Sequence, residues 1–164
     1  EKIPQLKPAF EKEGTITAAN ASTINDGAAA ILLGNEDYKK QAQFKLLAYA
    51  VHAQEPTWFS TAPIEAMKKC LAKTKLSFAD ISAFEINEAF AMVTMLAIKK
   101  LGLDASKVNV KGGACALGHP IGASGARILV TLLHALKNKG LKKGLASLCI
   151  GGGEATAIGI EVPL

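Results

Sequence analysis

The sequence predicts an α/β domain built around a mixed sheet. Three observations indicate this class. Strand-like apolar segments alternate with segments of helical spacing, several helix-like segments begin at proline or end at glycine, and two strand-like segments close the chain as a hairpin. The chain has 164 residues, which is long enough for one domain with its own core.

The first third of the chain predicts an irregular lead-in and then the start of the α/β core. Residues 1–13 are charged and contain proline, and Asn25-Asp26-Gly27 is typical of a turn. We therefore divide the chain into a lead-in over residues 1–27 and a core over residues 28–164. The elements expected next are a strand over 28–33, a short helix over 36–42 and a strand over 44–52.

The rest of the chain continues the alternation. We expect helices over 63–73, 88–101 and 120–139, and strands over 80–86, 107–110, 145–150 and 155–162. Three glycines, residues 151–153, separate the last two strands and indicate a hairpin. The helix over 88–101 is apolar almost all round. We therefore expect it to be buried on more than one side, against a second layer or a second half beyond this chain.

Composition excludes several classes of protein. The net charge of +5 suits an anionic partner, but the lysines cluster where helices end, and only nine side chains are aromatic, so a nucleic-acid surface is not indicated. The three cysteines form no CxxC pair, and no apolar stretch reaches membrane-spanning length. No secretory signal opens the chain. We expect an intracellular protein with no membrane partner.

His119 is the first candidate for chemistry because it lies in the glycine-rich segment GGACALGHPIGASGAR, residues 112–127. Pro120 suits the first position of a helix, which would place His119 near the N-cap, at the positive end of the helix dipole. That field disfavours the imidazolium and keeps the ring able to accept a proton. The alternative is a histidine that only caps the helix.

Two more candidates lie at strand ends. Cys149 closes an apolar strand and precedes three glycines whose N–H groups could bind an oxyanion; the alternative is a small buried hydrophobic residue. Asn87 ends a strand, and the alternative for it is an N-cap. Because α/β proteins place their sites at the carboxyl ends of strands, the convergence of Asn87, His119 and Cys149 favours function for all three. A metal site of Cys115, His119 and Cys149 is disfavoured, since no fourth ligand is apparent.

Three segments together resemble the thiolase family. They are Asn87-Glu88-Ala89-Phe90, Gly118-His119-Pro120-Ile121-Gly122 and Cys149-Ile150-Gly151-Gly152-Gly153, in this order, and residues 17–29 match the loop before them. The resemblance covers nearly the whole chain and is nearest to the acetoacetyl-CoA type. It implies the C-terminal domain of a thiolase, with a mixed five-stranded sheet and helices on both faces.

The resemblance also implies an activity, the Claisen condensation of two acetyl-CoA molecules or thiolytic cleavage in reverse, through an acetyl-cysteine. His119 would activate the nucleophilic thiol, and Cys149 would move the α-proton. Asn87 would hold a water that forms an oxyanion hole with His119, and the N–H of Gly151 would contribute to a second one. The residues expected to contact coenzyme A or the acyl group are Ser22, Ala18, Ala21, Phe90 and Phe59.

The resemblance implies no cofactor beyond the coenzyme A thioester substrates, although some members bind potassium near residues that match Ala18, Ala19 and Ala21. Family members carry their nucleophilic cysteine in a CGSG-like segment, which this chain lacks. We therefore expect that the N-terminal half is absent, that the fragment alone is inactive, and that the full-length protein is a dimer or tetramer.

Three questions stay open at this point. A non-catalytic acyl-CoA-binding or scaffolding domain of the same fold is the alternative function. A ketoacyl synthase is a remote third reading, because those enzymes usually have a histidine or an asparagine where Cys149 stands. The location, mitochondrion or cytosol, is undecided because a targeting segment would precede residue 1.

Overall fold

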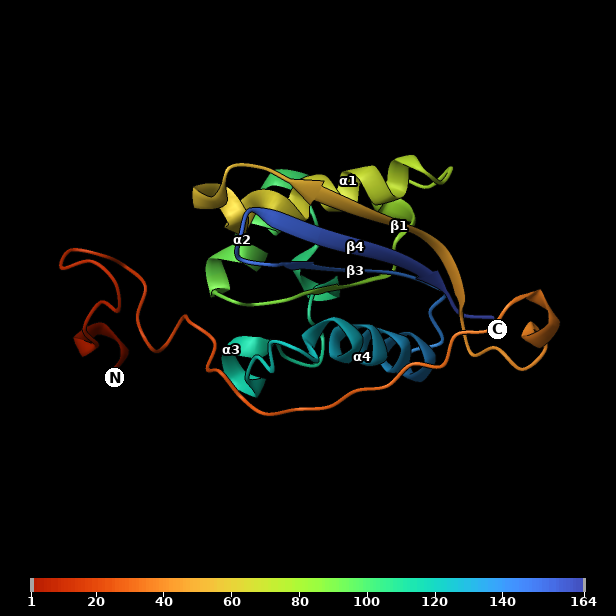
Figure 1. The fold of residues 1–164 in the computed structure, drawn as a ribbon, viewed down its shortest axis with the longest axis horizontal. Helices are drawn as coiled ribbons and strands as arrows, with labels where there is room; N and C mark the ends of the chain where they lie inside the picture. Colours follow the sequence, from red (N-terminus) through yellow and green to blue (C-terminus); the bar gives the residue numbers. More distant parts are fainter. Residues whose placement is uncertain (1, 164) are drawn as a thin grey trace.

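The structure is a computed structural model that describes residues 2–163. Its helices and strands are, in chain order, β1 (Lys45–Ala53), α1 (Ala62–Ala72), β2 (Ala83–Ile86), α2 (Ala91–Leu101), α3 (Ala114–Leu117), α4 (Ser124–Asn138), β3 (Lys143–Cys149) and β4 (Glu154–Glu161). Five short 3-10 turns accompany them: Ile3–Gln5 and Glu36–Tyr38 before β1, and Pro56–Thr61, Phe78–Asp80 and Ala105–Lys107 after it. Figure 1 shows α1 and α4 on opposite sides of the sheet. Within residues 2–163, no helix combines the length and apolar character needed to cross a membrane.

The sheet is mixed, as the sequence predicts, but it has four strands rather than five. The strand order is β1-β4-β3-β2, with β3 parallel to β2 and the other neighbours antiparallel. The segment 107–110 contributes only an isolated bridge, between Val108 and Phe84. Asn109 has a φ of 48°, in the left-handed region, so the backbone turns away before a ladder can form.

The expected strand over 28–33 is also wrong for this chain. These residues form no strand, and the side chains of Leu32 and Leu33 are 97% and 70% exposed. Figure 1 shows the segment, in orange, running along the outer side of α4. The helix expected over 36–42 is reduced to the 3-10 turn Glu36–Tyr38. Ile31 packs against the cluster under α4, but residues 28–33 have no strand partner among the described residues.

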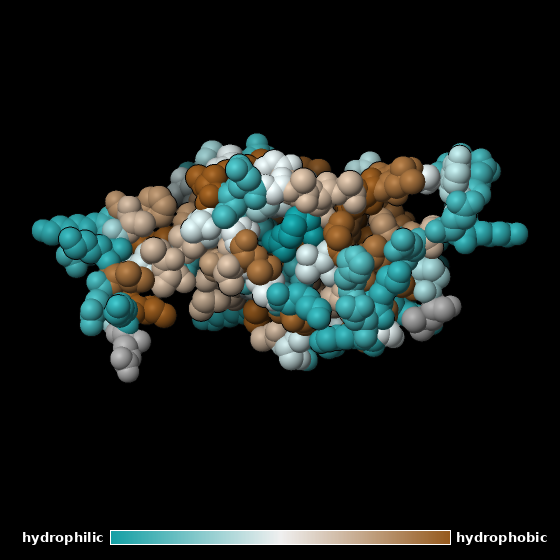
Figure 2. Space-filling view, turned by 90° about the horizontal axis from the view of Figure 1, so that it is seen from below, coloured by the Kyte–Doolittle hydropathy of each residue, from teal (hydrophilic) through white to brown (hydrophobic). Residues whose placement is uncertain are grey.

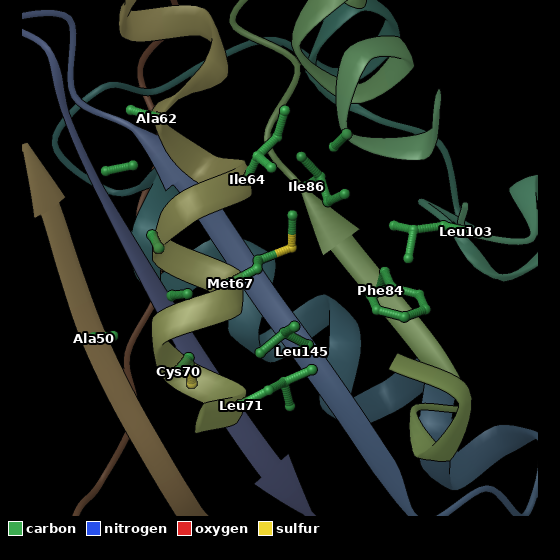
Figure 3. Packing of buried hydrophobic residues seen from close by; sticks show 14 of the residues in the cluster. Ala50, Ala62, Ile64, Met67, Cys70, Leu71, Phe84, Ile86, Leu103 and Leu145 are labelled. Carbon is green, nitrogen blue, oxygen red and sulfur yellow. The ribbon is translucent and has the colours of Figure 1, made fainter. Parts of the chain in front are cut away.

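Helices cover both faces of the sheet, as expected. Along β2 the side chains alternate, so Phe84 and Ile86 join the cluster under α1 and α2 while Ala83 joins the cluster under α4. In Figure 3, Met67 of α1 lies over the sheet beside Leu145, and both are fully buried. The two apolar clusters hold β2 and β3 rigidly between the helices.

Helix α2 is covered on one side by this chain, and its predicted burial on a second side depends on residues beyond the chain. Its residues Val93 and Ala97 are fully buried against the α1 cluster, but Met95 is 66% exposed. In this chain the helix therefore buries one face only. Its other apolar face remains open to solvent.

The hairpin between β3 and β4 confirms the glycine signal. The Ile150 N–H donates to the Glu154 carbonyl at 2.9 Å. Gly153 has a φ of 104°, and a Cβ there would overlap the carbonyl oxygen of Gln54. Only glycine combines this backbone conformation with so close an approach.

Candidate functional site

The site lies where β2 and β3 end side by side. Because the two strands are parallel, their carboxyl ends meet at one edge, and the Asn87 N–H extends the ladder by donating to the Ser147 carbonyl at 3.0 Å. Asn87 and Cys149 are the residues at or just after these two ends. His119 comes to the same edge from the loop between α3 and α4. The expected convergence of these three residues on one edge is thus present in the backbone.

Asn87 and His119 are in direct contact. The distance from Asn87 Nδ2 to His119 Nε2 is 3.3 Å, and Asn87 is 1% exposed. The N-cap of α2 is Phe90, so Asn87 does not cap that helix. A buried amide whose side chain meets a histidine has a role other than capping.

His119 does not cap a helix either. Helix α4 begins at Ser124, so the expectation that Pro120 opens the helix is wrong; residues 121–123 form a turn. His119 Nδ1 lies 2.6 Å from Ser124 Oγ, which in turn lies 3.0 Å from the Pro120 carbonyl oxygen. Since that carbonyl can only accept, the Ser124 hydroxyl donates to it and accepts from Nδ1–H. This assignment leaves Nε2 as the acceptor that faces Asn87.

The surroundings of His119 favour its neutral form. Burial lowers the pKa of the imidazole, and the positive charge of Arg127 lowers it further. The direction agrees with the sequence analysis, but these causes are burial and a neighbouring cation. A neutral ring whose Nε2 is unprotonated is able to take a proton from a thiol.

Cys149 is buried at the end of β3, and its side chain belongs to the cluster under α1 and α2. Burial raises the pKa of its thiol, so the neutral form dominates at pH 7. Among residues 2–163, no hydrogen bond joins Cys149 to His119 or to Asn87. Gly151, two residues later, is exposed and has a φ of 98°, in the region that favours glycine.

The segment before residue 25 is fastened to the same edge. Ala21 forms an antiparallel bridge with Phe90, and Ser22 donates to the Ala89 carbonyl from both its N–H, at 3.1 Å, and its hydroxyl, at 2.9 Å. The His119 N–H donates to the Thr23 carbonyl at 2.9 Å. Ser22 and Ala21, two of the expected coenzyme A contacts, therefore lie beside the Asn87–His119 pair. Ala18 lies in the tight turn that precedes them.

The ring of Phe90 packs against two other aromatic rings. Its ring centroid lies 6.1 Å from that of Phe59 and 5.8 Å from that of Phe10, both in edge-to-face arrangements. The two expected acyl-contacting residues, Phe59 and Phe90, are thus neighbours. Phe10 was missed by the sequence analysis, because a single aromatic residue in a charged lead-in carries no periodic signal.

Two charged residues behind Asn87 were also missed. Arg127 Nη2 lies 3.5 Å from Asn87 Oδ1, and Arg127 Nη1 lies 3.9 Å from Glu85 Oε2. Both residues carry a signal in the sequence. Arg127 is the only arginine of the chain, and Glu85 stands inside the apolar segment AFEI. A charge within an otherwise buried strand indicates a partner or a function.

Cys115 lies near the pair without joining it. Its N–H donates to Glu88 Oε2 at 3.1 Å, and its sulfur lies 3.8 Å from the Glu88 carbonyl oxygen. Burial and the nearby Glu88 carboxylate raise the pKa of the Cys115 thiol. In the part of the chain that the structure describes, no three His, Cys, Asp or Glu side chains lie close enough to hold a metal ion.

Two family models match the chain, one over most of its length and one at its start. The family model described as thiolase, C-terminal domain, matches residues 39–162, and the one described as thiolase, N-terminal domain, matches residues 1–37. The first match covers most of the core. The second places the chain's opening segment, including residues 28–33, with the N-terminal domain of the family.

Curated relatives are close in sequence but much longer. A probable acetyl-CoA acyltransferase of Staphylococcus aureus is 52% identical over 161 residues, which are 96% of this chain and 41% of the relative. A probable acetyl-CoA acetyltransferase of Dictyostelium discoideum is 50% identical, over 98% of this chain and 40% of the relative. The chain therefore spans about two fifths of these proteins.

Solved structures confirm the fold. The acetyl-CoA acetyltransferase of Bacillus anthracis superposes with a TM-score of 0.94 at 45% identity, over 99% of this chain and 42% of the other. The Acat5 thiolase of Ascaris suum, solved in complex with coenzyme A, gives 0.88 at 48% identity, over 99% of this chain and 44% of the other. The family model that covers residues 39–162, more than half of the chain, leads to one conclusion: the chain belongs to the thiolase family.

Proposed function

We propose that this chain supplies the acid/base part of an acetyl-CoA C-acetyltransferase. The reaction is the Claisen condensation of two acetyl-CoA molecules to acetoacetyl-CoA and coenzyme A, or thiolytic cleavage in reverse. The observation that carries the proposal is the buried contact between Asn87 and His119 at the edge where Cys149 also lies. A carbanion next to a thioester needs a base at the α-carbon and donors at the developing oxyanion, and this edge offers both.

Each residue has a separate role in the proposed reaction. His119, neutral and with Nε2 unprotonated, takes the proton of a nucleophilic thiol, which replaces the Asn87 amide N–H as the donor to that nitrogen. Burial raises the pKa of the Cys149 thiol. As a thiolate, Cys149 takes the α-proton of the second acetyl group and becomes a thiol; in the cleavage direction the thiol returns that proton to the carbon. The Asn87 carboxamide and His119 serve one thioester oxygen through a water. The N–H of Gly151, in an exposed turn, serves the other.

The nucleophilic thiol belongs, in this proposal, to residues outside the chain. The relatives are more than twice as long, and the family model of the thiolase N-terminal domain matches only residues 1–37 of this chain. The segment 28–33 is apolar and forms no strand, and Leu32 and Leu33 are exposed, which is the expected state of a strand separated from its sheet. We propose that it pairs with the sheet of the N-terminal domain, which also covers the open face of α2.

Coenzyme A would lie along the segment that crosses Phe90. Ser22, Ala18 and Ala21 have small side chains there, so a ligand can approach the backbone. Phe59 and Phe90 would line the acyl group. If a potassium ion is bound, the carbonyl oxygens of Ala18, Ala19 and Ala21 are suitable hard ligands, since none of them accepts a hydrogen bond within residues 2–163.

A chimera tests the proposal. Residues 1–164 would replace the matching part of the Staphylococcus aureus relative, and cleavage of acetoacetyl-CoA by coenzyme A would be measured. The chimera should be active, and His119→Ala should lower kcat by about 10²–10⁴-fold. The isolated chain should be inactive. An inactive chimera that folds and still binds coenzyme A would favour the scaffolding alternative instead.

A further inference from the structure

Glu85 and Arg127 form a charged pair directly behind the Asn87 carboxamide. Glu85 lies on β2, two residues after Ala83 and two before Asn87. Because side chains alternate along a strand, Glu85 is on the same side as Ala83, the side that faces α4. Arg127 lies in the first turn of α4. The side chains are 2% and 19% exposed, so the pair is largely removed from water.

The pair is poorly arranged as a device for stability. Its closest approach, Arg127 Nη1 to Glu85 Oε2, is 3.9 Å, beyond hydrogen-bond distance. Among the residues that the structure describes, Glu85 Oε1 and Arg127 Nε and Nη1 have no hydrogen-bond partner. Burial raises the pKa of Glu85 to about 7 despite the positive charge of Arg127, while the Glu88 carboxylate also raises it. Buried charges kept at such a cost often serve specificity.

The contact that Arg127 makes with Asn87 has a directional consequence. A guanidinium can only donate, so the atom of the Asn87 carboxamide that faces Arg127 Nη2 at 3.5 Å must be the oxygen. The amide nitrogen then points to His119, and because it only donates, His119 Nε2 must be unprotonated. The proton of the neutral ring is therefore on Nδ1, where Ser124 Oγ accepts it at 2.6 Å.

We propose that Arg127, held by Glu85, is a positioning residue that fixes the orientation of the Asn87 carboxamide and thereby the tautomer of His119. The inference rests on the proposed function, in which Nε2 receives the thiol proton. Without the guanidinium, the carboxamide is free to turn over and present its oxygen to the ring. Nε2 would then carry the proton, and the Ser124 hydroxyl would turn from the Pro120 carbonyl to donate to Nδ1. In that state the ring could not act as a base at Nε2.

The experiment uses the chimera described above and measures tautomer and turnover separately. Arg127→Met alone leaves the Glu85 carboxyl buried without its partner and is at risk of misfolding. The double variant Glu85→Met/Arg127→Met removes both charges and keeps an apolar filling. Arg127→Lys keeps a cation that only donates. Glu161→Gln is the matched control, because it removes one carboxylate from the half-buried pair that Lys143 of β3 forms with Glu161 of β4, away from Asn87.

The ¹⁵N chemical shifts of the His119 ring report the tautomer without any need for turnover. The unsubstituted protein and Glu161→Gln should show an unprotonated Nε2. The double variant should show a mixture of tautomers, a kcat lowered roughly 10- to 100-fold and an unchanged KM. Arg127→Lys should recover part of both. An unprotonated Nε2 that persists in the double variant overturns the inference, even if the chimera is active. An inactive chimera with the expected tautomer change contradicts only the proposed function.

Discussion

Asn87 Nδ2 lies 3.3 Å from His119 Nε2, and both residues lie at positions where a simpler reading of the sequence expects helix caps. Phe90 occupies the N-cap of α2, and α4 begins five residues after His119. The contact joins residues 32 positions apart in the chain. A change of charge at Asn87 should therefore change the pKa of His119.

Replacing Asn87 by aspartate should slow the reaction and shift its pH dependence. A carboxylate beside His119 favours the imidazolium, so the pKa of the ring should rise from its lowered value. The acid limb of the kcat/KM profile of the chimera should move to higher pH, and kcat should fall by about 10²-fold. Asn138→Asp, at an exposed position near the end of α4, is the control. An unshifted acid limb in Asn87→Asp would contradict the assigned contact.

Glu85 should make the stability of the protein decrease as pH rises. Its pKa is raised by burial to about 7 from an ordinary value of 4.5, so between these values the folded state binds more protons than the unfolded state. The free energy of unfolding should therefore fall between pH 5 and pH 8, by roughly 3 kcal/mol at most, and Glu85→Gln should remove that part of the fall.

The measurement is urea unfolding of both proteins across this pH range. His119 contributes with the opposite sign, because its lowered pKa makes stability fall as pH drops below 6.5. The difference between Glu85→Gln and the unsubstituted protein largely cancels that contribution. A difference that does not vary with pH would show that Glu85 is charged throughout.

Gly153→Ala should destabilise the hairpin at the site more than a comparable change elsewhere. A Cβ at Gly153 meets the Gln54 carbonyl oxygen, whereas Gly140, which also has a positive φ of 62°, has open space around its Cα. Gly140→Ala should cost about 1 kcal/mol from backbone conformation alone. Gly153→Ala should cost roughly 2 kcal/mol more, because the backbone must also move. Equal losses in chemical denaturation would argue against the close approach.

Leu32→Lys should separate the stability of the chain from its association with an N-terminal half. The side chain is 97% exposed, so the melting temperature of the isolated chain should change little. If residues 28–33 form a strand with the other half, the charge would be placed in an interface. Affinity for a co-expressed N-terminal half should then fall about tenfold or more.

Val51→Lys is the control for this experiment, since Val51 is also apolar and exposed, at 56%, but lies on β1, outside residues 28–33. Association that is equally insensitive to both substitutions would place the contact elsewhere on the chain.

Figure 2 shows one face of the molecule, on which exposed apolar side chains, in brown, lie among polar ones.

Local patterns predicted most elements whose partners lie in this chain, although the strand expected over 107–110 is reduced to one bridge with Phe84. The spacing of α1 and the glycines between β3 and β4 predicted their elements to within a few residues. Residues 28–33 have the same apolar pattern as a strand, yet they form none here. A strand exists only through its pairing, and no neighbouring backbone is available to these residues among those described.

The residue types at the site were determined by the sequence, because Asn87, His119 and Cys149 each stand at a strand end or in a glycine-rich loop. The tertiary structure decided which of them meet. It brought Asn87 into contact with His119, whereas the side chain of Cys149 lies in the core cluster under α1 and α2. It also brought Arg127 and Glu85 behind the amide. Hydrogen bonds between residues far apart in the chain depend on how β2 packs against α4, and no local pattern encodes that distance.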